Sequence, residues 1–128
     1  MVSFKISTKE KFHVIAVQNP ALTANMAVEL QDKLYEYLDI SPCNVILVLT
    51  QVEKVDLPVL LMLSELKTLY YENNTSFVVC CANAFIHNLI QSEALDEAIN
   101  YVPTESEAYD IVQMDEIERD FEEDIDAS

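Results

Sequence analysis

The chain of 128 residues is long enough for one domain, and its hydrophobic content of 51% is too high for a disordered protein. Its formal net charge of −16 argues against nucleic acid or an anionic membrane as a partner, because either would repel it. The absence of glycine excludes a phosphate-binding P-loop, a dinucleotide-binding fingerprint and a nucleophile elbow, which all need glycine's backbone freedom.

The amino-terminal third predicts a β-hairpin followed by an amphipathic helix. Residues 4–8 and 12–17 have the composition of strands, with a charged turn between them. Thr23 is placed to cap a helix that runs to about Asp39. Its apolar positions fall on one stripe at helical spacing, as expected for a helix packed on a core.

The central stretch, residues 45–74, organises the rest of the chain. Its apolar run over residues 45–49 predicts a strand buried on both faces. Asp56 is placed as the N-cap of the next helix, accepting the free amides of its first turn, and Pro58 is tolerated there. The expected core stripe of this helix is Val59, Met62, Leu63, Leu66, Leu69 and Tyr70. The neighbouring stripe, which need not be fully buried, is Leu57, Leu61, Ser64 and Thr68.

The carboxyl-terminal part predicts two more strands and two helices. Residues 75–81 form a buried strand, on which neighbouring Cys80 and Cys81 should point to opposite faces. Asn83 can cap a helix to about residue 91, and residues 99–102 form a last strand. The residues expected to point inward from the short helix are Phe85, Ile86, Leu89 and Ile90.

A final helix opens with a capping box made by Thr104 and Glu107. Its apolar residues are expected on roughly one face: Ala108, Ile111, Met114, Ile117 and Phe121. We divide the chain into a domain over residues 1–114 and an acidic helix end over residues 115–128, which frays into a solvated tail.

The titratable and nucleophilic residues do not assemble into a recognisable catalytic or metal-binding pattern. His13 and His87 have no partner suggested by the sequence, and Cys80 and Cys81 lack CxxC spacing and read as buried thiols. The C-terminal acids lack the spacing and glycine of a calcium loop. We therefore expect no enzyme, cofactor or metal.

Asp56 could act as a catalytic acid or phosphoacceptor at the seam between strand and helix, but capping explains it without further assumption. The exposed apolar surface formed by Leu57, Pro58 and Leu61 is either a docking patch or simple core packing.

The element order ββαβαβαβα, the run from Val45 to Leu49 leading to Val55-Asp56-Leu57-Pro58-Val59-Leu60, and the later run from Phe77 to Asn83 resemble the STAS domain. This is the fold of bacterial anti-sigma factor antagonists, and the resemblance covers about residues 4–112. It implies an α/β fold with a mixed, mostly parallel sheet of four to five strands and helices packed against it. It also implies an anti-sigma factor or kinase-like ATPase as partner.

The family's motif after the third strand departs in its central three positions. The family has Asp-Ser-Ser/Thr-Gly-Leu, and its second hydroxyl residue is phosphorylated; here Asp56 and Leu60 match, but Leu57, Pro58 and Val59 stand between them. Proline has no hydroxyl, so phosphorylation at that position is impossible. The family's usual acidic residue before the first helix falls near Thr23, which also fails to match.

Our leading hypothesis is a non-enzymatic module in the cytoplasm, since no signal peptide or membrane span is visible. It would dock a regulatory protein through the start of the second helix. The residues proposed for docking are Asp56, Leu57, Pro58, Leu61 and Ser64, with Thr23 and Asn83 on neighbouring loops. Two alternatives remain open: a small STAS-type subunit of a lipid-transport ATPase complex, and a homodimer or larger homo-oligomer that packs through the acidic final helix.

Overall fold

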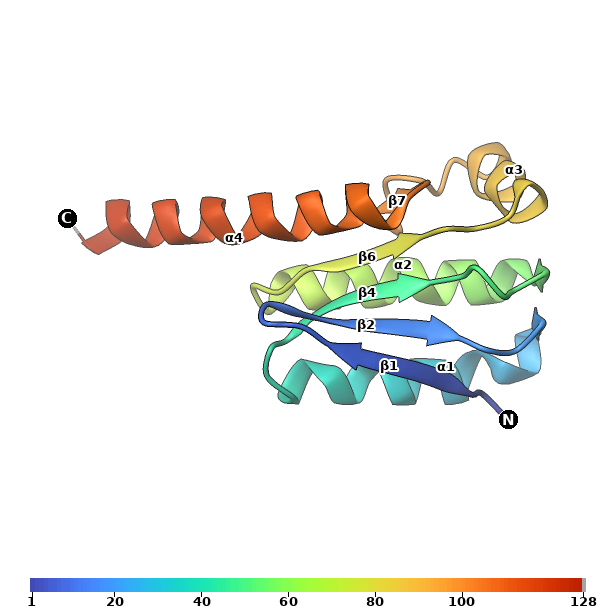
Figure 1. Ribbon diagram of the computed structural model, residues 1–128. Helices are drawn as coiled ribbons and strands as arrows, with labels where there is room; N and C mark the ends of the chain where they lie inside the picture. Colours follow the sequence, from blue (N-terminus) through green and yellow to red (C-terminus); the bar gives the residue numbers. More distant parts are fainter. Residues whose placement is uncertain (128) are drawn as a thin grey trace.

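A five-stranded sheet in the order β1-β2-β4-β6-β7 forms the centre of the structure (Figure 1). This computed structural model describes residues 1–127, and the side chains of residues 1–121. The strands are β1 (Phe4–Thr8), β2 (Phe12–Val17), β4 (Asn44–Val48), β6 (Phe77–Cys80) and β7 (Tyr101–Val102). β1 pairs antiparallel with β2 and the others pair parallel, so the expected mixed, mostly parallel sheet is confirmed.

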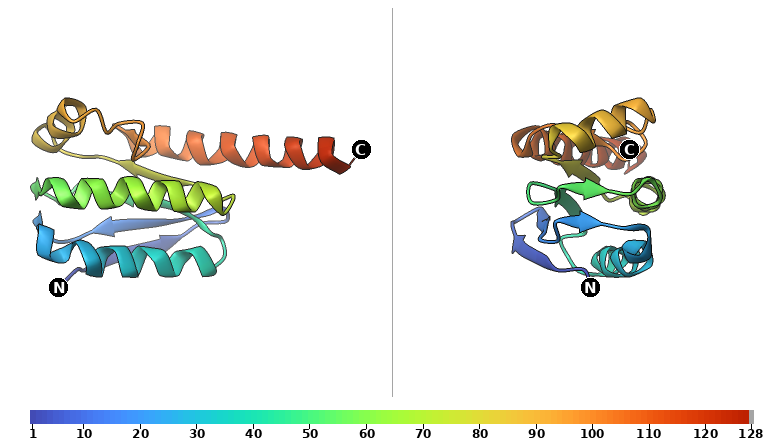
Figure 2. Two further views of the ribbon diagram at one scale, coloured as in Figure 1. Left: turned by 180° about the vertical axis from the view of Figure 1, so that it is seen from behind. Right: turned by 90° about the vertical axis from the view of Figure 1, so that its right-hand side faces the viewer.

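Helices cover both faces of the sheet (Figure 2). They are α1 (Ala27–Tyr35), α2 (Leu57–Glu72), α3 (Ala84–Ser92) and α4 (Glu105–Ala127), and 3-10 turns η1 (Ala24–Met26) and η2 (Glu36–Asp39) extend α1 at both ends. The first three helices pack on one face, and α4 packs on the other. The helices predicted from periodicity are therefore confirmed.

β4 is buried on both faces, as its continuous apolar run predicts. Val45 and Leu47 point into the larger cluster under α1 and α2. Ile46 and Val48 point to the smaller cluster, which Ala108 and Val112 of α4 complete. Full burial of such side chains contributes roughly 1.5–3 kcal/mol each, so β4 stabilises the hydrophobic clusters on both faces of the sheet.

α4 contacts the sheet with a face different from the one expected. Ala108 and Val112 are buried, and Asp115 and Arg119 continue the same helical stripe toward the strands. The apolar residues Met114, Ile117 and Phe121 lie on the opposite side and are 59%, 62% and 64% exposed. The expectation that they share a face with Ala108 is wrong, because the stripe drawn through them drifts around the helix. The end of α4 also extends past the strands (Figure 1).

The predicted inward orientation of Phe85 is also wrong. Ile86 and Ile90 of α3 are fully buried, whereas Phe85 is 66% exposed. A helix of nine residues fits two neighbouring apolar stripes equally well, and packing against the sheet selects one of them.

Candidate functional site

The three helices on the first sheet face all begin at the carboxyl end of the strands, on the right of Figure 1. Thr23, Asp56 and Asn83 are the N-cap residues of η1, α2 and α3. The structure therefore brings the three predicted loop residues to one end of the sheet, as expected. Their role in binding a partner remains a prediction.

Asp56 caps a different helix from the one expected. Its backbone has the extended conformation of an N-cap, but its side chain accepts no hydrogen bond from α2. The Oδ2 atom instead accepts a hydrogen bond from the backbone N–H of Ala24 at 2.8 Å. The carboxylate therefore satisfies a free amide at the start of η1, so the starts of two helices are tied together.

Thr23 does not cap its helix through its side chain, contrary to expectation. Its backbone carbonyl accepts the N–H of Met26 at 2.9 Å, but the hydroxyl makes no cap hydrogen bond. The amide of Ala24 already binds Asp56, and this contact takes over part of the capping.

A short two-stranded sheet, not foreseen from the sequence, holds these loops together. β3 (Ala21–Leu22) pairs parallel with β5 (Lys54–Val55). The N–H of Glu53 donates to the carbonyl of Pro20 at 2.7 Å, and the N–H of Asp56 donates to the carbonyl of Leu22 at 2.9 Å. The segment before α2 is thus fixed by backbone hydrogen bonds on both sides of β5.

Asn83 behaves as predicted and makes one further contact. Its Oδ1 accepts the N–H of Ile86 at 2.8 Å, so it caps α3. Its Nδ2 donates to the carbonyl of Glu53 at 3.1 Å, which ties the start of α3 to the loop before α2. Asp56 and Asn83 therefore hold three helix starts in fixed relative positions.

The outer face of α2 carries the predicted apolar stripe. Pro58 is exposed, Leu61 is 46% exposed, and Leu57 is half-buried with its side chain against the core. Leu60, which matches the family's leucine, is fully buried. Only Pro58 and Leu61 therefore offer substantial apolar surface at this helix start.

Ser64 lies one turn further along α2. Its hydroxyl donates to the carbonyl of Leu61 at 2.6 Å. The half-buried residue lines a surface depression of about 520 Å³ on the outer side of α2, bordered by Gln31 of α1 and by Ala98. The depression extends the accessible surface of α2 beyond its first turn.

Two exposed apolar residues at this end were missed by sequence reasoning. Val28 and Phe85, each the second residue of its helix, are 67% and 66% exposed. Val28 lies outside the predicted stripe of α1, and residues three or four positions away on the helix surface, Asn25, Gln31 and Asp32, are polar, which is the signal that could have marked it as an outward apolar residue. With Pro58 and Leu61, each of the three helix starts carries at least one solvent-facing apolar side chain.

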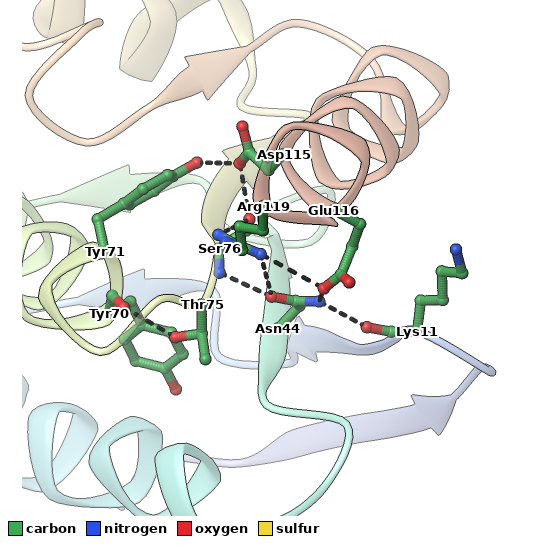
Figure 3. A network of polar contacts seen from close by, with 9 residues as sticks. All are labelled: Lys11, Asn44, Tyr70, Tyr71, Thr75, Ser76, Asp115, Glu116 and Arg119. Atoms are coloured by element: carbon green, nitrogen blue, oxygen red, sulfur yellow. Dashed lines mark hydrogen bonds and ion pairs between the residues drawn. The ribbon is translucent and has the colours of Figure 1, made fainter. Parts of the chain in front are cut away.

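A second polar cluster lies at the opposite, amino end of the parallel strands (Figure 3). The hydroxyls of Tyr71 and Ser76 both donate to Asp115 Oδ2 at 2.6 Å, and Arg119 Nη2 donates to Ser76 Oγ at 2.8 Å. Asn44 Nδ2 donates to Glu116 Oε1 at 2.7 Å, and Asn44 Oδ1 accepts the N–H of Ser76.

This cluster shows that the first part of the acidic C-terminal segment is not a solvated tail. Ser76 is fully buried and Asn44 is 4% exposed, so α4 seals polar groups that would otherwise be buried without partners. Burial and the hydrogen bond to Asp115 raise the pKa of Tyr71, which stays neutral. α4 continues as a helix to Ala127, and the division of the chain at residue 114 remains a prediction; Ser128 lies outside the described residues.

The two histidines occupy ordinary structural environments. His13 is buried; its Nδ1 lies 2.8 Å from Thr8 Oγ1 and its Nε2 lies 3.1 Å from the carbonyl oxygen of Ile40. His87 packs edge-on against Tyr101, with 3.3 Å between Nδ1 and the phenol oxygen. Within the described residues, no group of three or more His, Cys, Asp or Glu side chains is arranged to hold a metal ion.

The structure thus defines a small α/β domain in which polar side chains at the carboxyl end of the sheet fix three helix starts. The STAS domain model matches residues 3–108, and the chain belongs to this family. No curated protein matches its sequence. In the part of the chain that the structure describes, no helix is long and apolar enough to cross a membrane.

Several solved structures share this fold. A candidate anti-sigma factor antagonist of Thermotoga maritima has a TM-score of 0.72 and 19% identity, over 86% of this chain and 94% of that chain. An anti-sigma factor antagonist of Mycobacterium paratuberculosis has a TM-score of 0.72 and 20% identity, over 88% and 95%. The murine anion transporter Solute Carrier 26 family member A9 has a TM-score of 0.69 and 17% identity, over 84% of this chain and 18% of that chain.

Proposed function

We propose that this chain is a non-enzymatic, cytoplasmic interaction module that docks a regulatory protein at the carboxyl end of its sheet. The docking surface comprises Asp56, Leu57, Pro58, Leu61 and Ser64 of the α2 segment, with Thr23 and Asn83 beside it. The observation that carries the proposal is the exposure of Leu61 and Pro58 on a helix start that Asp56 and the β3–β5 pairing hold rigid. A preorganised apolar surface loses little entropy on binding.

The fold of anti-sigma factor antagonists supports a partner of the kind that the resemblance implies, an anti-sigma factor or a kinase-like ATPase. Pro58 stands where that family carries its phosphorylated hydroxyl, at an exposed position of the first helical turn. A phosphate cannot be added there, so the proposed docking is constant instead of being switched by phosphorylation.

A second candidate function is the bracing of a membrane transport complex. One observation favours it: the same fold occurs inside a murine anion transporter, where it matches 18% of that chain. In this reading the chain is an accessory subunit of a lipid-transport ATPase, and the partner is its nucleotide-binding subunit.

A third candidate is self-association through α4. Met114, Ile117 and Phe121 form an apolar stripe that faces solvent, so a second copy could bury it. The high negative charge of the chain opposes this, because both copies would bring acidic helices together.

The test compares capture of partners by wild type, Leu61→Asp and Ile40→Asp. Leu61 and Ile40 have matched exposures of 46% and 44%, but Ile40 lies at the opposite end of the sheet, before β4. Both substitutions add the same charge, so a difference in binding between the two variants reflects the position of the substituted residue. A purified partner is then titrated with each variant, and circular dichroism confirms that all three are folded.

We expect Leu61→Asp to weaken binding at least tenfold and Ile40→Asp to leave it unchanged, because truncating or charging a central apolar contact commonly has effects of this size. Mass spectrometry of the captured protein separates the candidates: an anti-sigma factor or kinase-like ATPase supports the leading proposal. A transport ATPase supports the second. Binding that survives Leu61→Asp, or a dimer disrupted by Ile117→Asp, places the interface elsewhere.

A further inference from the structure

Cys80 and Cys81, at the carboxyl end of β6, lie with their sulfur atoms 3.6 Å apart. Alternation along a regular strand would send the two side chains to opposite faces, as we expected from the sequence. Cys81 instead has a φ of 66°, in the left-handed region that residues with a Cβ atom rarely occupy. This backbone turn reverses the alternation and brings both side chains toward the α4 side of the sheet.

The left-handed conformation is unfavourable for an ordinary residue, and Asn or Asp tolerates it better than Cys does. The chain thus holds a cysteine where its conformation is disfavoured, and the result is a close thiol pair. Strained positions of this kind often mark functional sites.

The two thiols have different surroundings. Cys80 is fully buried among Ile46, Val78 and Ala108, and burial followed by the influence of Cys81 raises the pKa of its thiol. Cys81 is only half-buried and packs on the edge of the same cluster. A reagent in water therefore reaches Cys81 first, with Cys80 behind it. Cys43 belongs to neither core cluster; it lies just before β4, at the other end of the sheet.

We propose that Cys80 and Cys81 form a redox-sensitive pair, converted by a hydroperoxide to a reversible disulfide between adjacent residues. The Cys81 thiolate attacks the peroxide, the O–O bond breaks, and the products are Cys81 sulfenic acid and an alcohol, or water from hydrogen peroxide. The Cys80 sulfur then attacks the Cys81 sulfur, and the S–O bond breaks. The hydroxide leaves with the Cys80 proton as water. Two thiols are oxidised and one peroxide is reduced.

Burial disfavours removal of the Cys80 proton, so proximity must drive the second step. Two reacting atoms held a few ångströms apart behave as if at very high concentration, which offsets a weak nucleophile. The sulfur–sulfur distance of 3.6 Å is just beyond the roughly 3–3.5 Å of near-attack geometries, so only a small movement is needed.

The disulfide would act as a reversible switch and not as a stabilising structural cross-link. Adjacent Cα atoms are about 3.8 Å apart, shorter than the roughly 4.4–6.8 Å of ordinary disulfides, so ring closure strains the peptide and leaves the bond easy to reduce. Asn83 follows two residues later and ties α3 to the Glu53 carbonyl. Oxidation therefore acts at the loop that positions the start of α3.

The test exposes the folded protein to excess hydrogen peroxide and reads the modification by intact-mass and peptide mass spectrometry. We expect the peptide carrying residues 80 and 81 to lose the mass of two hydrogens in wild type and in Cys43→Ser. An excess of glutathione should restore it. In Cys80→Ala, which removes the second thiol, Cys81 should instead accumulate oxygen as sulfinic acid.

Three outcomes would overturn the proposal. One is addition of oxygen to Cys81 in the wild type at the level seen in Cys80→Ala. The second is a disulfide that includes Cys43 or joins two chains. The third is a thiol pair that survives peroxide unchanged. If Cys80→Ala fails to fold, Cys81→Ser at the half-buried position serves instead, and it must abolish the loss of two hydrogens.

Discussion

The carboxylate of Asp56 binds the backbone amide of Ala24, 32 residues earlier in the chain, at 2.8 Å. A side chain positioned as the N-cap of α2 thus completes the helical segment that precedes it. The contact joins the starts of η1 and α2, so the stability of one helix start depends on a residue of the other.

Replacing Asp56 by alanine is expected to lower the free energy of unfolding by about 0.5–2 kcal/mol, the usual effect of losing an N-cap acceptor. Asp56→Asn keeps an acceptor oxygen and should lose less. The measurement is urea denaturation followed by circular dichroism.

The matched control is Asp39→Ala, at an exposed aspartate whose side chain has no hydrogen bond to the described residues. It should change stability by less than about 0.5 kcal/mol. Equal losses at the two positions would show that general charge, and not the Ala24 contact, governs the effect.

The contact of Arg119 with Ser76 predicts coupled mutations. Ser76→Ala removes a fully buried hydroxyl that bonds to both Asp115 and Arg119, and Arg119→Met removes the donor itself. Each is expected to destabilise the fold by about 1–3 kcal/mol, because buried polar groups are left without partners. The double mutant should deviate from the sum by about 0.5 kcal/mol or more.

Chemical denaturation of the four proteins in this cycle provides the measurement. Glu118→Gln, on the exposed side of the same helical turn, is the control and should have little effect. Strict additivity of the two substitutions would contradict the idea that the network acts as one unit.

The phenol of Tyr109 predicts a loss of stability at alkaline pH. The hydrogen bond that it donates to Glu105, at 2.6 Å, raises the pKa of Tyr109 to about 12, and burial adds to the effect. An unfolded tyrosine ionises near a pKa of about 10. The folded state thus favours the neutral phenol, and its stabilising effect is present below about pH 10 and declines as the pH rises toward 12.

Unfolding midpoints measured across this alkaline range should fall less steeply for Tyr109→Phe than for wild type. The other tyrosines with raised pKa values, Tyr37, Tyr70, Tyr71 and Tyr101, are common to both proteins and cancel in the comparison. A titration followed by tyrosinate absorbance should show one fewer phenol ionising at high pH in the variant than in wild type. Identical curves would show that Tyr109 is already free of Glu105 in solution.

The glycine-free composition predicts a simple stabilising substitution. Ala94, exposed after α3, has a φ of 54°, where a Cβ atom is unfavourable. Ala94→Gly is expected to raise the free energy of unfolding by up to about 1 kcal/mol, the relief of this strain being partly offset by a more flexible unfolded chain.

The same substitution at Ala84, an exposed residue in the first turn of α3 with ordinary helical backbone, should have the opposite sign. Glycine there is destabilising by roughly 0.5–1 kcal/mol. Thermal unfolding of the two variants checks the pair, and destabilisation by both would argue against the left-handed conformation at Ala94.

Sequence patterns predicted the features that depend on neighbours along the chain. The apolar run at β4 and the cap at Asn83 follow from periodicity and local hydrogen bonding, and both are confirmed. The core stripe expected on α2 is confirmed except at Leu69, which is half-buried, whereas Leu60, which was left out of it, is fully buried. The placement of Thr23, Asp56 and Asn83 at one end also followed, because helices in an α/β fold start where parallel strands end.

Sequence patterns did not predict the contacts that depend on distant residues. The residues that flank Asp56 in the sequence do not indicate that its carboxylate binds the amide of Ala24. Those that flank Asp115 do not indicate that it accepts a hydrogen bond from a buried serine at the amino end of β6. The orientation of Cys81 depends on one dihedral angle, which residue type alone does not determine. Short helices such as α3 leave the choice of buried face to tertiary packing.

The order of strands in the sheet is also their order in the chain. A nascent polypeptide can therefore add each strand to the edge laid down just before it, beginning with the local hairpin of β1 and β2. The sheet face formed by Ile46, Val48 and Val78 remains exposed to solvent until α4 has been synthesised. Among the elements described, α4 is therefore the last to join the domain, and a ribosome stalled before residue 105 would carry an apolar sheet face available to chaperones.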